Sequence, residues 1–240
     1  MFELKTTSKK ILADTITPVS IYLKLRDRYP NSLLLESSDY HASDNSFSYI
    51  CCNPIASFKV ENDVITESLP DGTVQTTKID RTASVPAAIQ KFSKRFKADA
   101  SDFKFINNGI FGYIGYDAVR YFENVEIKRK EKDLKIPDVY YAVYQNIIAI
   151  NHFKNEAYIF DHSYESESKL EEIEQLLKVK NFASYNFSRI KQPYSNLNDD
   201  QYRDVVEAAK EHCQRGDVFQ LVLSRRFSQK FKGDEFNVYR

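Results

Sequence analysis

Three polar side chains near the end of the chain, Gln220, Ser224 and Arg226, are spaced an even number of residues apart. Residues 218–223 are apolar apart from Gln220, which is typical of a strand buried on both faces. Alternate side chains of a strand share a face, so an amide, a hydroxyl and a guanidinium would lie in a row. They could hydrogen-bond a small polar ligand. Alternatively, neighbouring backbone satisfies Gln220 within a core, because an unsatisfied buried amide costs about 1–3 kcal/mol.

A second polar group follows three leucines at 33–35, which predict a short buried strand. Glu36, Ser37 and Ser38 come directly after it. The carboxylate could pair with an ammonium group, and the hydroxyls could hydrogen-bond a ligand's carboxylate or ring nitrogen. This arrangement suits an amino-acid site. The alternative is a strand that simply ends in solvent.

The histidines and cysteines show no recognisable catalytic or metal-binding pattern. The histidines are scattered, at His41, His152, His162 and His212. The cysteines, Cys51, Cys52 and Cys213, lack metal-ligand spacing, and we expect all three to be small buried hydrophobic residues. Cys51 and Cys52 are adjacent in a strand-like run, so they should point to opposite faces.

The elements that must position these groups begin with a strand at 4–14 and a helix from Pro18, because proline is favoured in a first helical turn. Four short strands with intervening turns, one of them at Asn53-Pro54, indicate an antiparallel meander. The four span Phe47–Cys52, Ile55–Glu61, Val64–Ser68 and Thr73–Ile79. A helix should follow at about Val85–Phe96.

The stretch 107–116 holds half of the chain's six glycines, at G-x-x-G-x-x-G spacing. This is neither the dinucleotide-binding nor the Walker pattern. It favours a strand that another backbone approaches closely. The remaining expected elements are a helical turn at Asp117–Phe122, strands at Val139–Asn151 and Ala157–Asp161, and helices at Tyr164–Lys178 and Asp199–Arg215. Asn198 can cap the last helix, with Gln201 three residues on.

Composition restricts the classes of function. The chain has 240 residues, 42% of them hydrophobic, and its 34 basic and 34 acidic side chains cancel. Without a basic field, nucleic-acid binding is not expected. No run approaches the ~18 apolar residues of a membrane span, and no signal peptide is evident, so we expect a cytoplasmic protein without membrane contact. A linker-like stretch at 186–197 separates a domain at 1–185 from a second at 198–240.

Four motifs, in this order and spacing, resemble component I of anthranilate synthase, in the chorismate-utilising enzyme family. They are Leu34-Leu35-Glu36-Ser37; Gly112–Asp117 with Arg120, Phe122 and Glu123; Pro137–Tyr140; and Tyr202–Glu211 running into Gly216–Phe227. The resemblance implies an α+β fold in which antiparallel sheets form a β-sandwich flanked by helices. Residues 1–185 would be a regulatory domain, and the strand at 218–229 would begin the sheet of an incomplete catalytic domain.

The complete enzymes of this kind convert chorismate and ammonia to anthranilate and pyruvate. Magnesium (Mg2+) is their cofactor, and a glutamine amidotransferase subunit supplies the ammonia. The family's catalytic histidine and magnesium-binding glutamates belong to a stretch without a counterpart in these 240 residues, so the chain is expected to be an amino-terminal portion that is inactive alone. By the same resemblance, Glu36 would pair with the ammonium of the feedback inhibitor L-tryptophan, and Ser37 and Ser38 would line its site.

Gln220 separates the chemistries within the family. Relatives that add water to chorismate place a lysine at the matching strand position as general base, whereas an amide does not titrate. Gln220 therefore argues for an ammonia-using member, with its side chain in the active-site wall. Ser224 and Arg226 are further candidates or purely structural. Two alternatives stay open: component I of aminodeoxychorismate synthase, in the folate branch, and a non-catalytic fragment that binds tryptophan or docks on the amidotransferase.

Overall fold

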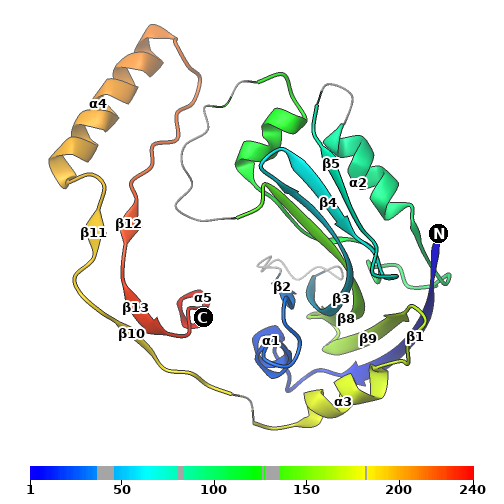
Figure 1. Cartoon of the computed structure of the whole chain (residues 1–240). Helices are drawn as coiled ribbons and strands as arrows, with labels where there is room; N and C mark the ends of the chain where they lie inside the picture. The colour runs from blue at the N-terminus through cyan, green and yellow to red at the C-terminus, as the bar shows by residue number, and fades with distance from the viewer. Residues whose placement is uncertain (37–45, 81–83, 126, 128–135, 182) are drawn as a thin grey trace. The chain divides into compact units, whose positions relative to one another are not determined.

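The computed structural model describes residues 1–36, 46–80, 84–125, 127, 136–181 and 183–240. They divide into two compact units, Met1–Ala183 and Ser184–Arg240. Figure 1 shows the elements of each, coloured along the chain. Among the described residues, no helix is long and apolar enough to cross a membrane.

The first unit is built on one nine-stranded sheet, with the long antiparallel strands β3 (Phe47–Glu61) and β8 (Val139–Asn151) at its centre. The order is β5 (Val74–Lys78), β4 (Val64–Ser68), β3, β8, β9 (Glu156–Ser163), β1 (Phe2–Leu12) and β6 (Phe96–Ala98), with β2 (Leu33–Leu35) added to β3 and β7 (Phe111–Ile114) to β8. Every pairing is antiparallel except β1 with β6. Helices with a mainly antiparallel sheet agree with the expected class, but the β-sandwich is not confirmed.

The turn predicted at Asn53-Pro54 is wrong. The chain passes through this point as one strand, and its register with β8 shifts between Pro54 and Ala56. Asn53 has φ 60°, a conformation that asparagine tolerates better than most residues. A dipeptide that is typical of turns therefore lies at a β-bulge, because the segments on both sides of it pair with β8.

Helices α1 (Pro18–Leu25) and α3 (Leu170–Lys178) share a core cluster with the sheet. It includes Ile21 and Leu25 of α1, Ile173 and Leu177 of α3, and Ile50, Cys52, Ile148 and Ile159 of the strands. The neighbouring positions Cys51 and Ile147 belong instead to a cluster with Phe111 and Phe160. Because strand side chains alternate, these clusters lie on opposite faces, and so do the two adjacent cysteines, as predicted.

The helix expected from Tyr164 begins only at Leu170. The preceding strand β9 continues to Ser163, and Asp161 on it is fully buried. Its Oδ2 accepts hydrogen bonds from the Lys169 N–H at 2.8 Å and from Asn146 Nδ2 at 2.7 Å. This carboxylate fixes the backbone immediately before α3 and so sets the start of the helix.

Helix α2 (Val85–Ser93) packs Val85 and Phe92 into another cluster with Phe58 and Val60 of β3. The helix ends earlier than predicted. Phe96, its expected last residue, pairs with Phe2 as the first residue of β6, because β1 offers it a strand partner.

The second unit contains α4 (Asp199–Arg215), whose two ends agree with the prediction. Asn198 and Gln201 exchange capping hydrogen bonds at 2.8 and 2.9 Å, and Gly216 follows the helix with φ 76°. The other elements are β10 (Phe187–Arg189) paired with β13 (Phe231–Gly233), β11 (Tyr194–Ser195) paired with β12 (Phe227–Ser228), and α5 (Phe236–Tyr239). β10 and β11 lie within residues 186–197, which were expected to form a linker. The expected boundaries of the two domains, 1–185 and 198–240, stay a prediction.

The strand predicted at 218–229 is absent apart from β12. Residues 218–226 have no regular structure, and Val222 is 83% exposed. A strand needs a neighbour for its backbone groups, and the described part of this unit supplies one only at Phe227–Ser228. Cys213 is also exposed, on a helix whose one buried residue in this structure is Ala209. The prediction that all three cysteines are buried is therefore wrong for Cys213.

Candidate functional site

Glu36 lies directly after β2, in the first unit. The three leucines of β2 pair with Tyr49, Ile50 and Cys51 of β3. Leu34 packs into the cluster shared by α1 and α3, whereas Leu33 packs against the cluster on the other face. The pairing ends at Leu35, and Glu36 is exposed. Ser37 and Ser38, the other residues of the predicted amino-acid site, lie outside the described residues.

If the β2–β3 register were extended by one residue beyond its last pair, Leu35 with Tyr49, Glu36 would fall opposite Ser48. Ser48 is fully buried, and its hydroxyl lies 2.7 Å from Nε2 of His152, the residue after β8. The His152 N–H donates to the Ser46 carbonyl at 3.1 Å and so fastens the two segments together. Glu36 and His152, both exposed, thus lie at the end of the sheet where β2 and β8 stop. A carboxylate and an imidazole can bind the ammonium and carboxylate groups of an amino acid.

Sequence reasoning singled out neither Ser48 nor His152 as a site residue. The two are 104 positions apart, and the β2–β3 pairing spans a long connection. No local spacing could reveal this juxtaposition. The one available signal was the position of His152 immediately after a long predicted strand.

The opposite end of β3 and β8 carries an ion pair that is largely buried. The 3₁₀ helix η1 (Tyr116–Tyr121) positions Arg120, whose Nη2 lies 2.5 Å from Oδ2 of Asp138, the residue before β8. The Tyr121 hydroxyl lies 3.0 Å from Asp63 Oδ1 and 3.1 Å from Asp138 Oδ2. Burial, together with the hydrogen bond to Asp63, raises the pKa of Tyr121 to about 12, so the phenol remains a donor. This network joins two of the sequence motifs, residues 112–123 and 137–140.

Gly112 allows the backbones of β7 and β8 to approach closely beside this network. A Cβ at this position would overlap the backbone carbonyl of Tyr140 on the adjacent strand β8. The close backbone approach predicted for the glycine-rich stretch is therefore confirmed at Gly112. Here the motifs 112–123 and 137–140 hold β7, η1 and β8 together, and their role in this unit is structural.

His162 on β9 makes a second interior link. Its Nε2 lies 2.7 Å from the Asn107 carbonyl oxygen, so Nε2 carries the proton and donates. Nδ1, 3.0 Å from the Thr6 hydroxyl, is then free to accept in the neutral ring. Burial lowers the pKa of His162, although the hydrogen bond to the Asn107 carbonyl and the charges of Asp161 and Asp99 oppose the shift. His162 therefore acts as a neutral structural bridge.

Gln220, Ser224 and Arg226 lie in the second unit, where all three are exposed and none is on a strand. The predicted polar row is therefore not formed in this structure. The neighbouring Arg225 contacts α4 and β11: Nη1 lies 2.6 Å from Asp199 Oδ1, and Nε donates to Ser195 Oγ at 2.8 Å. The hydrogen bond from Arg225 lowers the pKa of Asp199.

The described ranges contain no cluster suited to a metal ion, and both thiols of the first unit are buried. No group of three or more histidine, cysteine, aspartate or glutamate side chains there is arranged to hold a metal ion. The residues present do not fit a magnesium site, and no step through a metal follows from them. Burial raises the pKa of the Cys52 thiol to about 12, which keeps it protonated and unreactive.

The chain is similar to known proteins along nearly its whole length. The model of the family described as chorismate binding enzyme matches residues 31–240. The chain is 28% identical to anthranilate synthase component 1 of Lactococcus lactis subsp. lactis over 97% of its length and 51% of that relative. It is 27% identical to the chloroplastic anthranilate synthase alpha subunit 1 of Arabidopsis thaliana, over 96% of this chain and 44% of the relative.

The crystal structure of anthranilate synthase component I from Streptococcus pneumoniae TIGR4 shares the fold. Its TM-score is 0.55 at 24% identity, and the match covers 96% of this chain and 51% of that one. The chain spans about half the length of the curated relatives it matches.

Proposed function

The chain belongs to the chorismate-binding enzyme family, and from this premise we propose that it supplies a regulatory unit and the start of the catalytic unit of an anthranilate synthase component 1. The complete enzyme would convert chorismate and ammonia to anthranilate and pyruvate. A glutamine amidotransferase subunit would supply ammonia, and Mg2+ would bind outside the described residues. The names of the relatives support this choice, because they align over 95–97% of the chain, the first unit included.

The observation that supports the regulatory role is the position of the exposed Glu36 directly after β2, at the same end of the sheet as His152. We infer that Glu36 binds the ammonium group of L-tryptophan. The exposed His152 imidazole at the same end of the sheet would orient the ligand's carboxylate. Because β2 is a three-residue strand anchored on β3 by its leucines, a ligand at its end acts directly on the sheet.

Gln220 is proposed as part of the active-site wall of the complete enzyme. Its amide does not titrate and cannot activate water as a general base, which suits ammonia as the nucleophile. In the present structure Gln220 is exposed. The proposed role therefore requires residues 218–226 to gain strand neighbours that the described second unit does not contain.

The test supplies the complete natural protein with chorismate, Mg2+ and ammonium, and runs the 240-residue chain in parallel. Pyruvate release and anthranilate fluorescence are followed with and without L-tryptophan. Both signals, suppressed by L-tryptophan, are expected from the complete protein, and neither from the 240-residue chain. Loss of chorismate without pyruvate would instead identify an aminodeoxychorismate synthase component.

A non-catalytic tryptophan-binding or docking protein is the second candidate function. It is favoured by the exposure of Gln220 and by the absence of a metal-binding cluster among the described residues. The same experiment separates the two, because this candidate predicts L-tryptophan binding without turnover by any form of the protein.

A further inference from the structure

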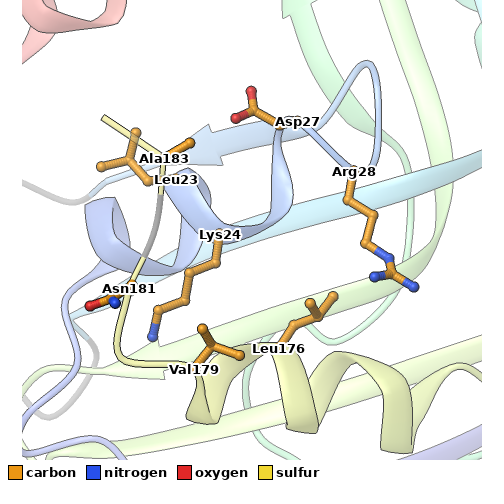
Figure 2. A pocket seen from close by; sticks show the side chains of 8 residues that line it. All are labelled: Leu23, Lys24, Asp27, Arg28, Leu176, Val179, Asn181 and Ala183. Atoms are coloured by element: carbon orange, nitrogen blue, oxygen red, sulfur yellow. The ribbon is translucent and has the colours of Figure 1, made fainter. Parts of the chain in front are cut away.

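A pocket of about 370 Å³ opens between α1 and the carboxyl-terminal end of α3, within the first unit (Figure 2). This volume lies at the small end of the range for ligand pockets, about 300–1,000 Å³. Its lining residues are Leu23, Lys24, Asp27, Arg28, Leu176, Val179, Asn181 and Ala183. None of them belongs to the proposed tryptophan site or to the proposed active-site wall.

Lys24 is the cation that lacks a counter-ion in this pocket. Its side chain reaches from α1 toward the end of α3, where Nζ donates to the Leu177 carbonyl oxygen at 2.7 Å. That carbonyl belongs to the last helical turn, whose oxygens lack intrahelical partners. Within the described ranges, no carboxylate lies at ion-pair distance from Lys24. Burial lowers its pKa, because the charged form is deprived of water without gaining a counter-charge.

The other charges around the pocket already have partners. Arg28 Nη2 lies 2.7 Å from Glu172 Oε1, and the Tyr29 hydroxyl donates to the same oxygen at 2.7 Å. Asp27 Oδ1 lies 3.7 Å from Nε of Arg26. The site therefore keeps an excess of one positive charge, located on Lys24.

Apart from the charged residues and Asn181, apolar side chains form the wall. Leu23 is buried in α1, whereas Val179 is 47% exposed beside Leu176 at the end of α3. Asn181 contributes an amide beyond that helix. A molecule that covered Val179 would remove apolar surface from water while presenting its polar end to Lys24. The pocket thus combines one uncompensated cation with an apolar surface.

We propose that this pocket binds an amphipathic monocarboxylate, an aromatic or short aliphatic acid, with the carboxylate on Lys24 Nζ and the apolar body over Leu176 and Val179. A lysine ammonium has three donors, and the contact with Leu177 uses one of them. Two remain for the ligand. A neutral molecule of the same shape would gain the apolar contact only, and a small inorganic anion would gain the charge only.

The test measures binding of 1-naphthoate and of the neutral 1-naphthalenemethanol to the whole chain by isothermal titration calorimetry. The acid should bind at least about 10-fold more tightly than the alcohol, the difference expected for one part-buried charge-assisted hydrogen bond. Lys24→Met should abolish this preference, and Lys24→Arg should retain it. Lys178→Met is the matched control, because Lys178 pairs with Glu174 at 2.8 Å and does not line the pocket; its affinity should equal the wild type's.

A second variant guards against loss of folding. Val179→Glu places a carboxylate in the pocket without touching the contact between Lys24 and Leu177, and it should abolish binding of 1-naphthoate. Circular-dichroism melting curves check that each variant remains folded. Equal affinity for acid and alcohol would overturn the proposal. So would unchanged naphthoate binding by folded Lys24→Met or Val179→Glu.

Discussion

Arg120 and Asp138 form an ion pair at 2.5 Å that ties η1 to the start of β8, and their side chains are only 15% and 4% exposed. The Asp138 backbone is held as well: its N–H donates to the Val60 carbonyl at 2.8 Å, and its carbonyl accepts from Gly115 N–H at 2.7 Å. The sequence motifs at 112–123 and 137–140, which the resemblance associates with an enzyme, thus meet in the interior of the first unit.

Removing one partner of this pair should be strongly destabilising. Asp138→Ala leaves a largely buried guanidinium without its carboxylate and should lower the free energy of unfolding by about 3–5 kcal/mol. Urea denaturation measures the change. In a double-mutant cycle with Arg120→Met, the double variant should be much less destabilised than the sum of the singles; strict additivity would show that the pair does not couple.

Gly112→Ala should destabilise the first unit more than Gly115→Ala does. The new Cβ would overlap the Tyr140 carbonyl, and backbone cannot yield as a flexible side chain can. Gly115→Ala is the matched control, since its Cβ would meet the Asp138 carbonyl oxygen at 3.3 Å. Thermal unfolding followed by circular dichroism should show a loss for Gly112→Ala that exceeds the loss for Gly115→Ala; the reverse order contradicts the prediction.

His162 should make stability fall in mild acid. Its pKa is lowered in the folded protein, so the unfolded chain takes up the proton first, near its ordinary value of about 6.5. The contribution is complete above that pH and is lost as pH falls toward the folded pKa, with a slope of at most about 1.4 kcal/mol per pH unit. His162→Gln should flatten the dependence in urea titrations between about pH 7.5 and 5. Parallel curves for both proteins would contradict this assignment.

The three cysteines should react at very different rates. Cys213 is exposed, whereas Cys51 and Cys52 are buried and burial raises the pKa of both thiols. A thiol-specific reagent such as dithionitrobenzoate should modify one cysteine rapidly in the native protein and all three in denaturant. Cys213→Ser should remove the rapid phase. A rapid phase that persists in this variant would mean that the sheet opens easily.

Glu36→Gln should weaken binding of L-tryptophan by about 10-fold or more, because the ligand's ammonium loses a charge-assisted partner. The chain contains no tryptophan, so the ligand's indole fluorescence reports binding directly. Glu61→Gln is the matched control: it lies at the other end of β3 and pairs with Lys59 at 3.1 Å. Equal losses in both variants would indicate a non-specific charge effect and remove Glu36 from the site.

Sequence patterns located elements whose signals are local. Both ends of α4 follow from Asn198, Gln201 and Gly216, and β8 follows from a long stretch rich in β-branched and aromatic residues. The bulge at Pro54 could not be predicted, because a turn-like dipeptide becomes strand only through pairing with β8. The prediction of a strand at 218–229 was wrong for the opposite reason. The apolar composition is typical of a strand between two neighbours, but the described second unit contains a partner only for Phe227–Ser228.

The residues of the candidate site also differ in whether a local sequence signal singles them out. Glu36 was singled out because it follows the leucines of β2, and its role in binding stays a prediction. Ser48 and His152 were not singled out, since only the register of β2 with β3 and of β3 with β8 brings them to that end of the sheet. The charge excess on Lys24 likewise depends on which partners Arg28 and Asp27 find in the folded unit.

The central pairing of β3 with β8 has a consequence for synthesis. Phe47 pairs with Asn151 and Val60 with Val139, so roughly 80 or more residues separate the partners along the chain. Translation at about 5–20 residues per second leaves β3 waiting several seconds for β8 to emerge from the ribosome. During that interval the edge of β3 that later pairs with β8 has no partner strand. Until β8 is synthesised, this unpaired edge is open to pairing with other chains.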